Sequence, residues 1–207
     1  MIRLNVYVDG FNLYFGMKEA GYDNCKWLDI HALATNIKNA QHTINKVKYF
    51  TSRISNNASK QQRQNIYLDA LASTPISIIT GQFRNEYQSC GNCGEGFWDS
   101  KEKMTDVNIA SNMIIDAYKD EYDVAFLISG DSDLVPPIKL VREAFPQKQI
   151  IVVFPPSRKG NELKQAANSS FALGRKKLED AQFPNSVKGK YGNTLNIPQP
   201  WKNAPIA

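Results

Sequence analysis

The sequence predicts an α/β protein in which βαβ units surround a mostly parallel sheet. Short β-rich runs alternate with longer segments of helical spacing, which is typical of such units. One run, Val124–Ile128, is apolar throughout, as expected for a strand buried on both faces of a parallel sheet. With 207 residues, 42% of them hydrophobic, the chain also has enough apolar side chains for one sizeable core.

The first 81 residues alternate regularly between strands and helices. We expect strands over residues 4–9, 46–51 and 75–81, separated by helices over residues 11–18, 28–38 and 57–71. The helix over 28–38 rests on four apolar residues at helical spacing: Leu28, Ile30, Leu33 and Ile37. The polar residues 57–64 are typical of a solvated helix face, and the sequence assigns them no function.

This alternation stops between residues 84 and 105. Apolar periodicity fails there, glycines cluster, and Cys90 and Cys93 form a Cys-x-x-Cys, so we predict an inserted loop. Regular spacing then returns. We expect helices over 107–118 and 134–144, strands over 124–128 and 149–154, a short helix over 162–167 and a short strand near residue 171.

The C-terminal quarter differs in composition and charge. Residues 155–207 carry nine Lys and Arg against three Asp and Glu, while the preceding residues carry 16 against 17. This basic segment favours a polyanionic partner such as nucleic acid, although a solvated tail is an equally simple interpretation. Prolines and glycines accumulate after residue 183, so we expect one domain over residues 1–183 and a poorly ordered tail over 184–207.

Composition argues against a membrane or secreted protein. No apolar run approaches the roughly 18 residues of a spanning helix, and the first residues lack the pattern of a signal peptide. An odd number of cysteines, two of them in a Cys-x-x-Cys, argues against a disulfide framework. We therefore expect a cytoplasmic location.

Four acidic residues stand at predicted element ends. Asp9 ends the first strand, Asp131 and Asp133 follow the strand over 124–128, and Asp106 opens the helix over 107–118. The C-terminal ends of parallel strands form a binding crevice, where such carboxylates can converge. Each acid alone is most simply a helix cap, but the joint pattern is hard to explain by capping.

Converging carboxylates repel one another unless a cation lies between them. Oxygen ligands without a nearby histidine favour Mg²⁺ or Mn²⁺ over Zn²⁺. Such an ion can orient a water, lower its pKa and neutralise charge on a phosphodiester, which points to a nuclease. A dinucleotide-binding domain is disfavoured, because no Gly-x-Gly-x-x-Gly follows the first strand.

Three segments, Val8–Leu13, Lys103–Ala110 and Leu127–Leu134, resemble in order and separation the motifs of the NYN domain family. That family belongs to the PIN-like nucleases and includes the LabA-like proteins, and the resemblance covers about residues 3–155. It implies a Rossmann-like three-layer α/β/α sandwich and a ribonuclease dependent on Mg²⁺ or Mn²⁺. The residues that it implies as catalytic metal ligands are Asp9, Asp106 and Asp131.

The resemblance also implies supporting residues. Asp133 and Asn12 would assist the catalytic acids, and Ser129 would place a hydroxyl near the substrate phosphate. Asn12 could instead be an ordinary residue of a first helical turn. Lys103 matches a lysine that commonly precedes the middle acid, and an exposed loop lysine is an equally simple interpretation.

Cys90 and Cys93 have the spacing of a zinc knuckle. A complete zinc site needs four ligands, and Cys25, His31, His42 or a second chain in a homodimer are the remaining sources. Two free thiols and a reversible disulfide are the alternatives.

Basic residues near the C-terminus are candidates for binding RNA phosphates. They are Arg158, Lys159, Arg175, Lys176, Lys177, Lys188 and Lys190. Tyr191 and Trp201 can stack on unpaired bases or dock on a protein surface. The sequence thus predicts a metal-dependent ribonuclease acting on RNA. The alternative is a non-catalytic RNA-binding or regulatory module that retains the acidic pocket, and DNA cleavage is a weaker one.

Overall fold

The computed structural model describes residues 1–55, 57–89, 91 and 93–202, with the side chains of 83–86, 88 and 97–103 excepted. Its centre is a seven-stranded sheet of order β4-β3-β2-β1-β5-β6-β7. Six strands run parallel, and β4 runs antiparallel beside β3. The strands are β1 (Ile2–Asp9), β2 (His42–Ser52), β3 (Ser77–Ser89), β4 (Gly96–Lys103), β5 (Val124–Ile128), β6 (Gln149–Phe154) and β7 (Ser169–Ala172). The predicted α/β class with a mostly parallel sheet is confirmed.

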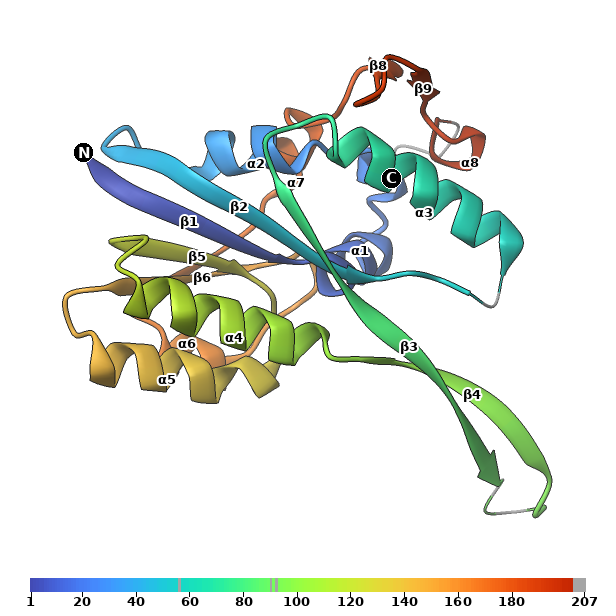
Figure 1. Ribbon diagram of the computed structural model, residues 1–207, viewed down its shortest axis with the longest axis horizontal. Coiled ribbons are helices and arrows are strands. Elements are labelled where there is room, and N and C mark those ends of the chain that lie inside the picture. Colours follow the sequence, from blue (N-terminus) through green and yellow to red (C-terminus); the bar gives the residue numbers. More distant parts are fainter. Residues whose placement is uncertain (56, 90, 92, 203–207) are drawn as a thin grey trace.

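Helices cover both faces of this sheet (Figure 1). One layer contains α1 (Gly10–Glu19), α2 (Ile30–Ile37), α3 (Ala58–Leu71) and α7 (Arg175–Glu179). The other contains α4 (Thr105–Tyr118), α5 (Val135–Ala144) and α6 (Asn161–Ala166). In the part of the chain that the structure describes, none of the helices has the length and apolar character needed to cross a bilayer.

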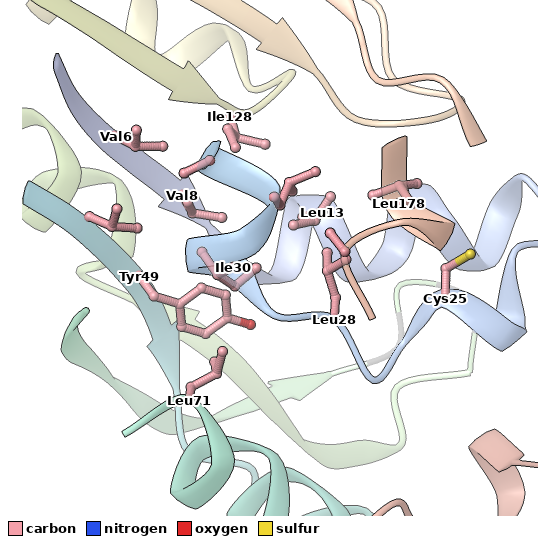
Figure 2. Packing of buried hydrophobic residues seen from close by; sticks show 14 of the residues in the cluster. Val6, Val8, Leu13, Cys25, Leu28, Ile30, Tyr49, Leu71, Ile128 and Leu178 are labelled. Atoms are coloured by element: carbon pink, nitrogen blue, oxygen red, sulfur yellow. The ribbon is translucent and has the colours of Figure 1, made fainter. Parts of the chain in front are cut away.

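The central strand β1 contributes to both hydrophobic layers, because successive side chains of a strand point to opposite faces. Val6 and Val8 pack with Leu13 and Ile30 in one cluster (Figure 2). Tyr7 between them is fully buried in the opposite cluster, beneath α4 and α5. Burial on both faces holds β1 rigidly, and with it the residue that ends the strand.

The order of the strands reverses at β1. From β1 the chain adds β2 and β3 on one side, and then returns to place β5, β6 and β7 on the other. Open α/β sheets bind ligands at such a reversal, in the crevice outside the carboxyl ends of the two central strands. Asp9 ends β1 and Ser129 follows β5, so both lie at this crevice.

The segment expected as a loop over 84–105 differs in the structure. Strands β3 and β4 form a long antiparallel hairpin, paired from Gln82 with Lys103 to Ser89 with Gly96. Figure 1 shows this hairpin projecting away from the body of the protein. Alternating apolar residues in a strand reflect burial of one face. A ribbon that leaves the body has little core to face, which explains why the strand pattern is weak in the sequence.

Residues 184–202 also differ from the expected poor order, while residues 203–207 of the predicted tail lie outside the described residues. Strands β8 (Ser186–Lys188) and β9 (Thr194–Asn196) form a second hairpin, followed by α8 (Gln199–Lys202). Leu195 and Trp201 are buried in the core cluster, and the indole Nε1 of Trp27 donates to the Pro184 carbonyl at 2.9 Å. The large apolar side chains of this segment pack against aromatic residues of the domain, and these contacts attach the segment to it. The domain boundary at residue 183 stays a prediction.

Candidate functional site

The ends of three elements surround one hollow of about 270 Å³, here called the acidic hollow. Three carboxylates that are far apart in the sequence line it: Asp9, Asp106 and Asp131. The other lining residues are Phe11, Asn12, Phe15, Met104, Thr105 and Arg158. The structure therefore brings together three of the four acids that the sequence singled out.

Asp9 caps α1 and lines the acidic hollow at the same time. Its Oδ1 accepts from the backbone N–H of Asn12 at 3.0 Å, and its Oδ2 accepts from the Ser129 hydroxyl at 3.0 Å. The residue is only 5% exposed. A carboxylate offers about four acceptor positions, so two hydrogen bonds orient it without exhausting it. Capping and a functional role are therefore compatible at this position.

Asp131 is built in the same way. Its Oδ1 accepts from the backbone N–H of Asp133 at 3.0 Å and so caps the short 3₁₀ helix Ser132–Leu134. Its own N–H donates to the Ser129 hydroxyl oxygen at 3.1 Å. Asp133 is exposed and does not line the hollow.

Ser129 links two of the acids. Its hydroxyl donates to Asp9 and accepts from the Asp131 backbone, and the residue is fully buried. The family resemblance implies a hydroxyl near the substrate phosphate, and that role stays a prediction. In the structure the hydroxyl bonds to both acids and so helps to set their relative position.

Asn12 and Gly130 join α1 to the loop after β5. The Asn12 side-chain oxygen accepts from the Gly130 N–H at 2.9 Å. A Cβ at residue 130 would lie 2.9 Å from the Cβ of Arg158, so only glycine fits without a shift. Arg158 pairs with Glu19 at 2.6 Å, and its Nε is buried without an acceptor among the described residues. Lys159 is exposed and does not line the hollow.

Asp106 reaches the hollow from a different direction. It lies in the first turn of α4, two residues after Met104, whose φ of 81° turns the chain from β4 into the helix. A left-handed conformation at a residue other than glycine costs roughly 1 kcal/mol. The N-terminal end of α4 also adds partial positive charge beside the carboxylates. The side chain of Lys103 lies outside the described residues.

The acidic hollow suits a hard cation, although it is not a closed metal cage. Among the residues that the structure describes, no three His, Cys, Asp or Glu side chains are grouped closely enough to hold an ion. Mg²⁺, however, is usually held by one or two carboxylates, with waters and substrate phosphates completing its shell. Separated carboxylates around an open hollow fit that requirement.

The zinc prediction gains no further ligand from the structure. Cys90 lies outside the described residues, and Cys93 is exposed. Cys25, one of the candidate ligands, is fully buried in the core. Burial raises the pKa of its thiol to about 11, which disfavours the thiolate that a metal requires.

A second hollow of about 280 Å³ adjoins the first, and Phe11 and Phe15 line both. We call it the aromatic hollow. Its other aromatic residues are Tyr14, Tyr49, Tyr67 and Trp201, and its basic residues are Lys18, Lys26, Lys60 and Arg63. Sequence reasoning missed this site. The polar residues 57–64 are typical of a solvated helix face, and no local sequence pattern indicates that Trp201 packs in the same hollow as that helix.

The comparisons with known proteins agree with this architecture. The NYN domain model matches residues 3–174, which include every residue that lines the acidic hollow. A relative, 6-hydroxy-3-succinoylpyridine 3-monooxygenase HspA of Pseudomonas putida, is 25% identical over 99% of this chain and 77% of its own length. The crystal structure of a protein of unknown function from Vibrio parahaemolyticus shares the fold, with a TM-score of 0.54 and 19% identity over 88% of this chain and 96% of that one.

Proposed function

Because the chain belongs to the NYN domain family, which has a nuclease-like fold, we propose that it is a metal-dependent ribonuclease. It would hydrolyse RNA phosphodiester bonds in the acidic hollow. The observation that carries this proposal is the convergence of Asp9, Asp106 and Asp131, from three separate elements, on one hollow where the strand order reverses.

The acids of the hollow and the residues that hydrogen-bond to them have different chemical tasks under this proposal. Asp9, Asp106 and Asp131 line the hollow, and one or two of them would bind each Mg²⁺ or Mn²⁺ ion, with waters and the substrate phosphate as the other ligands. Such an ion, when bound, supplies charge neutralisation on the phosphodiester and activation of a water for in-line attack. Ser129 and Asn12 hold the acids in place through the hydrogen bonds described above.

Arg158 is the candidate phosphate contact. It lines the hollow, and its buried Nε donor finds no acceptor in the part of the chain that the structure describes. A buried donor without an acceptor is costly, and a phosphate oxygen would satisfy it. The ring of Phe11 supplies an apolar wall nearby. Apolar walls lower the local dielectric constant and strengthen interactions between charges.

The test is a cleavage assay with labelled single-stranded RNA in Mg²⁺, in Mn²⁺ and in EDTA. We expect the wild-type protein to cleave with either ion and not in EDTA. Asp131→Asn should lose cleavage while retaining its thermal melting temperature. Glu143→Gln removes one exposed carboxylate from α5, away from the hollow, and should cleave like the wild type.

Two other results would overturn the proposal. If neither ion supports cleavage of several RNAs and both proteins still bind RNA, the domain is a binding module that retains the acidic hollow. If EDTA leaves the cleavage rate unchanged, the carboxylates do not act through a metal.

The monooxygenase relative suggests a second candidate function, which is the binding of a small heteroaromatic ligand. Its name assigns it a substituted pyridine as substrate, which is a planar heteroaromatic acid. The aromatic hollow, with four basic residues around aromatic rings, could accept a small ligand of that class. Calorimetric titration with a pyridine carboxylate tests this candidate, and the absence of binding at millimolar concentration would dismiss it.

A further inference from the structure

We infer that the aromatic hollow is a stacking site for one base of a single-stranded RNA, next to the phosphodiester that occupies the acidic hollow. The identity of the strand rests on the proposed function, but the site itself rests on its own geometry. The chemistry it recognises is a planar heteroaromatic ring attached to an anion.

The wall shared by the two hollows presents an aromatic surface. The rings of Phe11 and Phe15 stack with centroids 6.1 Å apart and planes inclined by 21°. Tyr14 packs edge-on against Phe15 at 5.4 Å, which fixes the orientation of that ring. Phe15 nevertheless remains 43% exposed. A large apolar ring that is held in place but left in contact with water is suited to stacking on a nucleobase.

The floor of the aromatic hollow is rigid. Tyr67 contacts Tyr49 and Trp201 in edge-to-face arrangements, with centroids 6.2 Å and 5.8 Å apart. All three residues are nearly buried. A preformed floor lowers the entropic cost of ordering a ligand. Trp201 comes from α8, outside the residues matched by the family model, so the C-terminal segment completes the hollow.

The charge of the aromatic hollow is complementary to a nucleic-acid backbone. Among the residues that the structure describes, four basic residues and no acidic residue line it. Lys26 already pairs with Asp23 and lies over the Tyr14 ring. In the part of the chain that the structure describes, no carboxylate forms a salt bridge with the remaining three, which are Lys18, Lys60 and Arg63. These cations can neutralise phosphates on either side of a stacked base.

Two neutral polar side chains of the hollow, Gln64 and Tyr67, already form hydrogen bonds within the fold. The Gln64 amide accepts from the Ile54 N–H and donates to the Ser52 carbonyl, both at 2.8 Å. The Tyr67 hydroxyl donates to the Leu28 carbonyl at 2.8 Å. Recognition would therefore depend on stacking and charge, which makes it tolerant of sequence.

The test is a scan with labelled oligonucleotides that lack one base, at a position moved along the strand. Binding is measured by fluorescence anisotropy in EDTA, so that no cleavage occurs. For the wild-type protein we expect one position at which loss of the base weakens binding about tenfold, the usual scale of one base–aromatic stack. In Phe15→Ala that dependence on position should disappear. Phe171→Ala is the matched control, because Phe171 on β7 is 37% exposed and lines neither hollow.

The outcomes separate this inference from the proposed function. A flat scan with the wild-type protein, or an unchanged scan with Phe15→Ala, overturns the stacking site even if the protein cleaves RNA. A dependence on position that Phe15→Ala removes supports the site even if no RNA is cleaved. Binding of nicotinic acid, with a flat oligonucleotide scan, would identify a small heteroaromatic acid as the occupant and overturn the inference.

Discussion

The two hollows share Phe11 and Phe15, yet their chemistry is opposite. The acidic hollow has three carboxylates that come from the end of β1, the start of α4 and the loop after β5. The aromatic hollow has four bases and no acid, and it is built from α1, β2, α3, α8 and the segments between them. One site is thus suited to a cation and the other to an anion with a planar ring. A single nucleotide chain can satisfy both, with a metal at the first and a base in the second.

A carboxylate that lies in neither hollow, that of Asp116, makes this comparison clearer. Asp116 on α4 is buried, and its Oδ2 accepts from Lys48 Nζ at 2.6 Å and from the Tyr7 hydroxyl at 2.7 Å. This carboxylate is neutralised by a partner within the fold. Those of the acidic hollow line an open hollow instead, although Asp9 is nearly as buried as Asp116. The environment of a carboxylate, rather than its presence, distinguishes structure from function here.

We expect the largest effect from Lys48→Met. It leaves Asp116 buried without its cation, which should lower the free energy of unfolding by about 3–5 kcal/mol. Urea denaturation measures this. The control is Lys46→Met, since Lys46 is 39% exposed in its pair with Glu121 and should contribute less than about 1 kcal/mol. Equal losses for the two variants would contradict the structural role of Asp116.

Asp9→Asn should distinguish the role of the acidic hollow in cleavage from the role of the aromatic hollow in RNA binding. Asparagine is as good a helix cap as aspartate, so the protein should fold normally. Cleavage at saturating RNA should fall about 100-fold or more, as when one transition-state contact is removed. Affinity for RNA should be unchanged or higher, because a negative charge is lost. A lower affinity with an unchanged cleavage rate would place Asp9 in binding instead of catalysis, and single-turnover kinetics distinguish the two.

Gly10→Ala should disturb both hollows at once. A Cβ at residue 10 would lie 2.5 Å from the Tyr49 ring and 2.7 Å from the Phe50 carbonyl oxygen. Since the carbonyl belongs to the backbone of β2, the start of α1 must shift, at a cost of about 1–3 kcal/mol. Thermal unfolding and the cleavage rate should both decline. Gly174→Ala, where a Cβ meets nothing within 4 Å, is the control.

The charge of the aromatic hollow predicts a change in salt dependence. Lys60→Gln combined with Arg63→Gln should reduce the slope of log affinity for single-stranded RNA against log salt by about 1.4, or about 0.7 for each phosphate contact. The matched control is Lys139→Gln with Lys164→Gln, two exposed lysines on α5 and α6. An equal change in the control pair would mean that binding is spread over the whole surface.

The smallest expected effect lies at the opposite end of β1, far from both hollows. Hydrogen bonds from the Arg3 side chain hold the pKa of Asp123 at about 2, below its ordinary value. The ionised pair stabilises the fold above about pH 4 and loses this contribution as the pH falls through 2. Arg3→Met should therefore be slightly less stable than the wild type at pH 7 and equally stable below pH 2, as followed by thermal unfolding. Cleavage at neutral pH should not change, because neither residue lines a hollow.

Much of the fold and the acidic hollow could be predicted without coordinates. Asp9 ends one buried strand and Asp131 follows another, and the rule that parallel strands share one functional edge predicts that they lie close together. The same local reasoning failed for the hairpin β3–β4, since a ribbon that leaves the body carries no strong burial pattern. For Ser129, the family resemblance implies a role near the phosphate that stays a prediction, because a hydroxyl next to two acids can face either a substrate or the acids themselves.

The aromatic hollow could not be found from residue patterns. Phe15, Tyr67 and Trp201 are separated by up to 186 positions. Trp201 alone is a stacking or docking candidate in the sequence, and nothing there indicates that it meets the other two. Periodicity and capping act over a few residues, so they place strand ends, helix starts and the acids attached to them. Which distant aromatic rings meet depends on how the helices pack on the sheet and on where the C-terminal segment docks. Those are long-range contacts, and they come into existence only when the whole chain is folded.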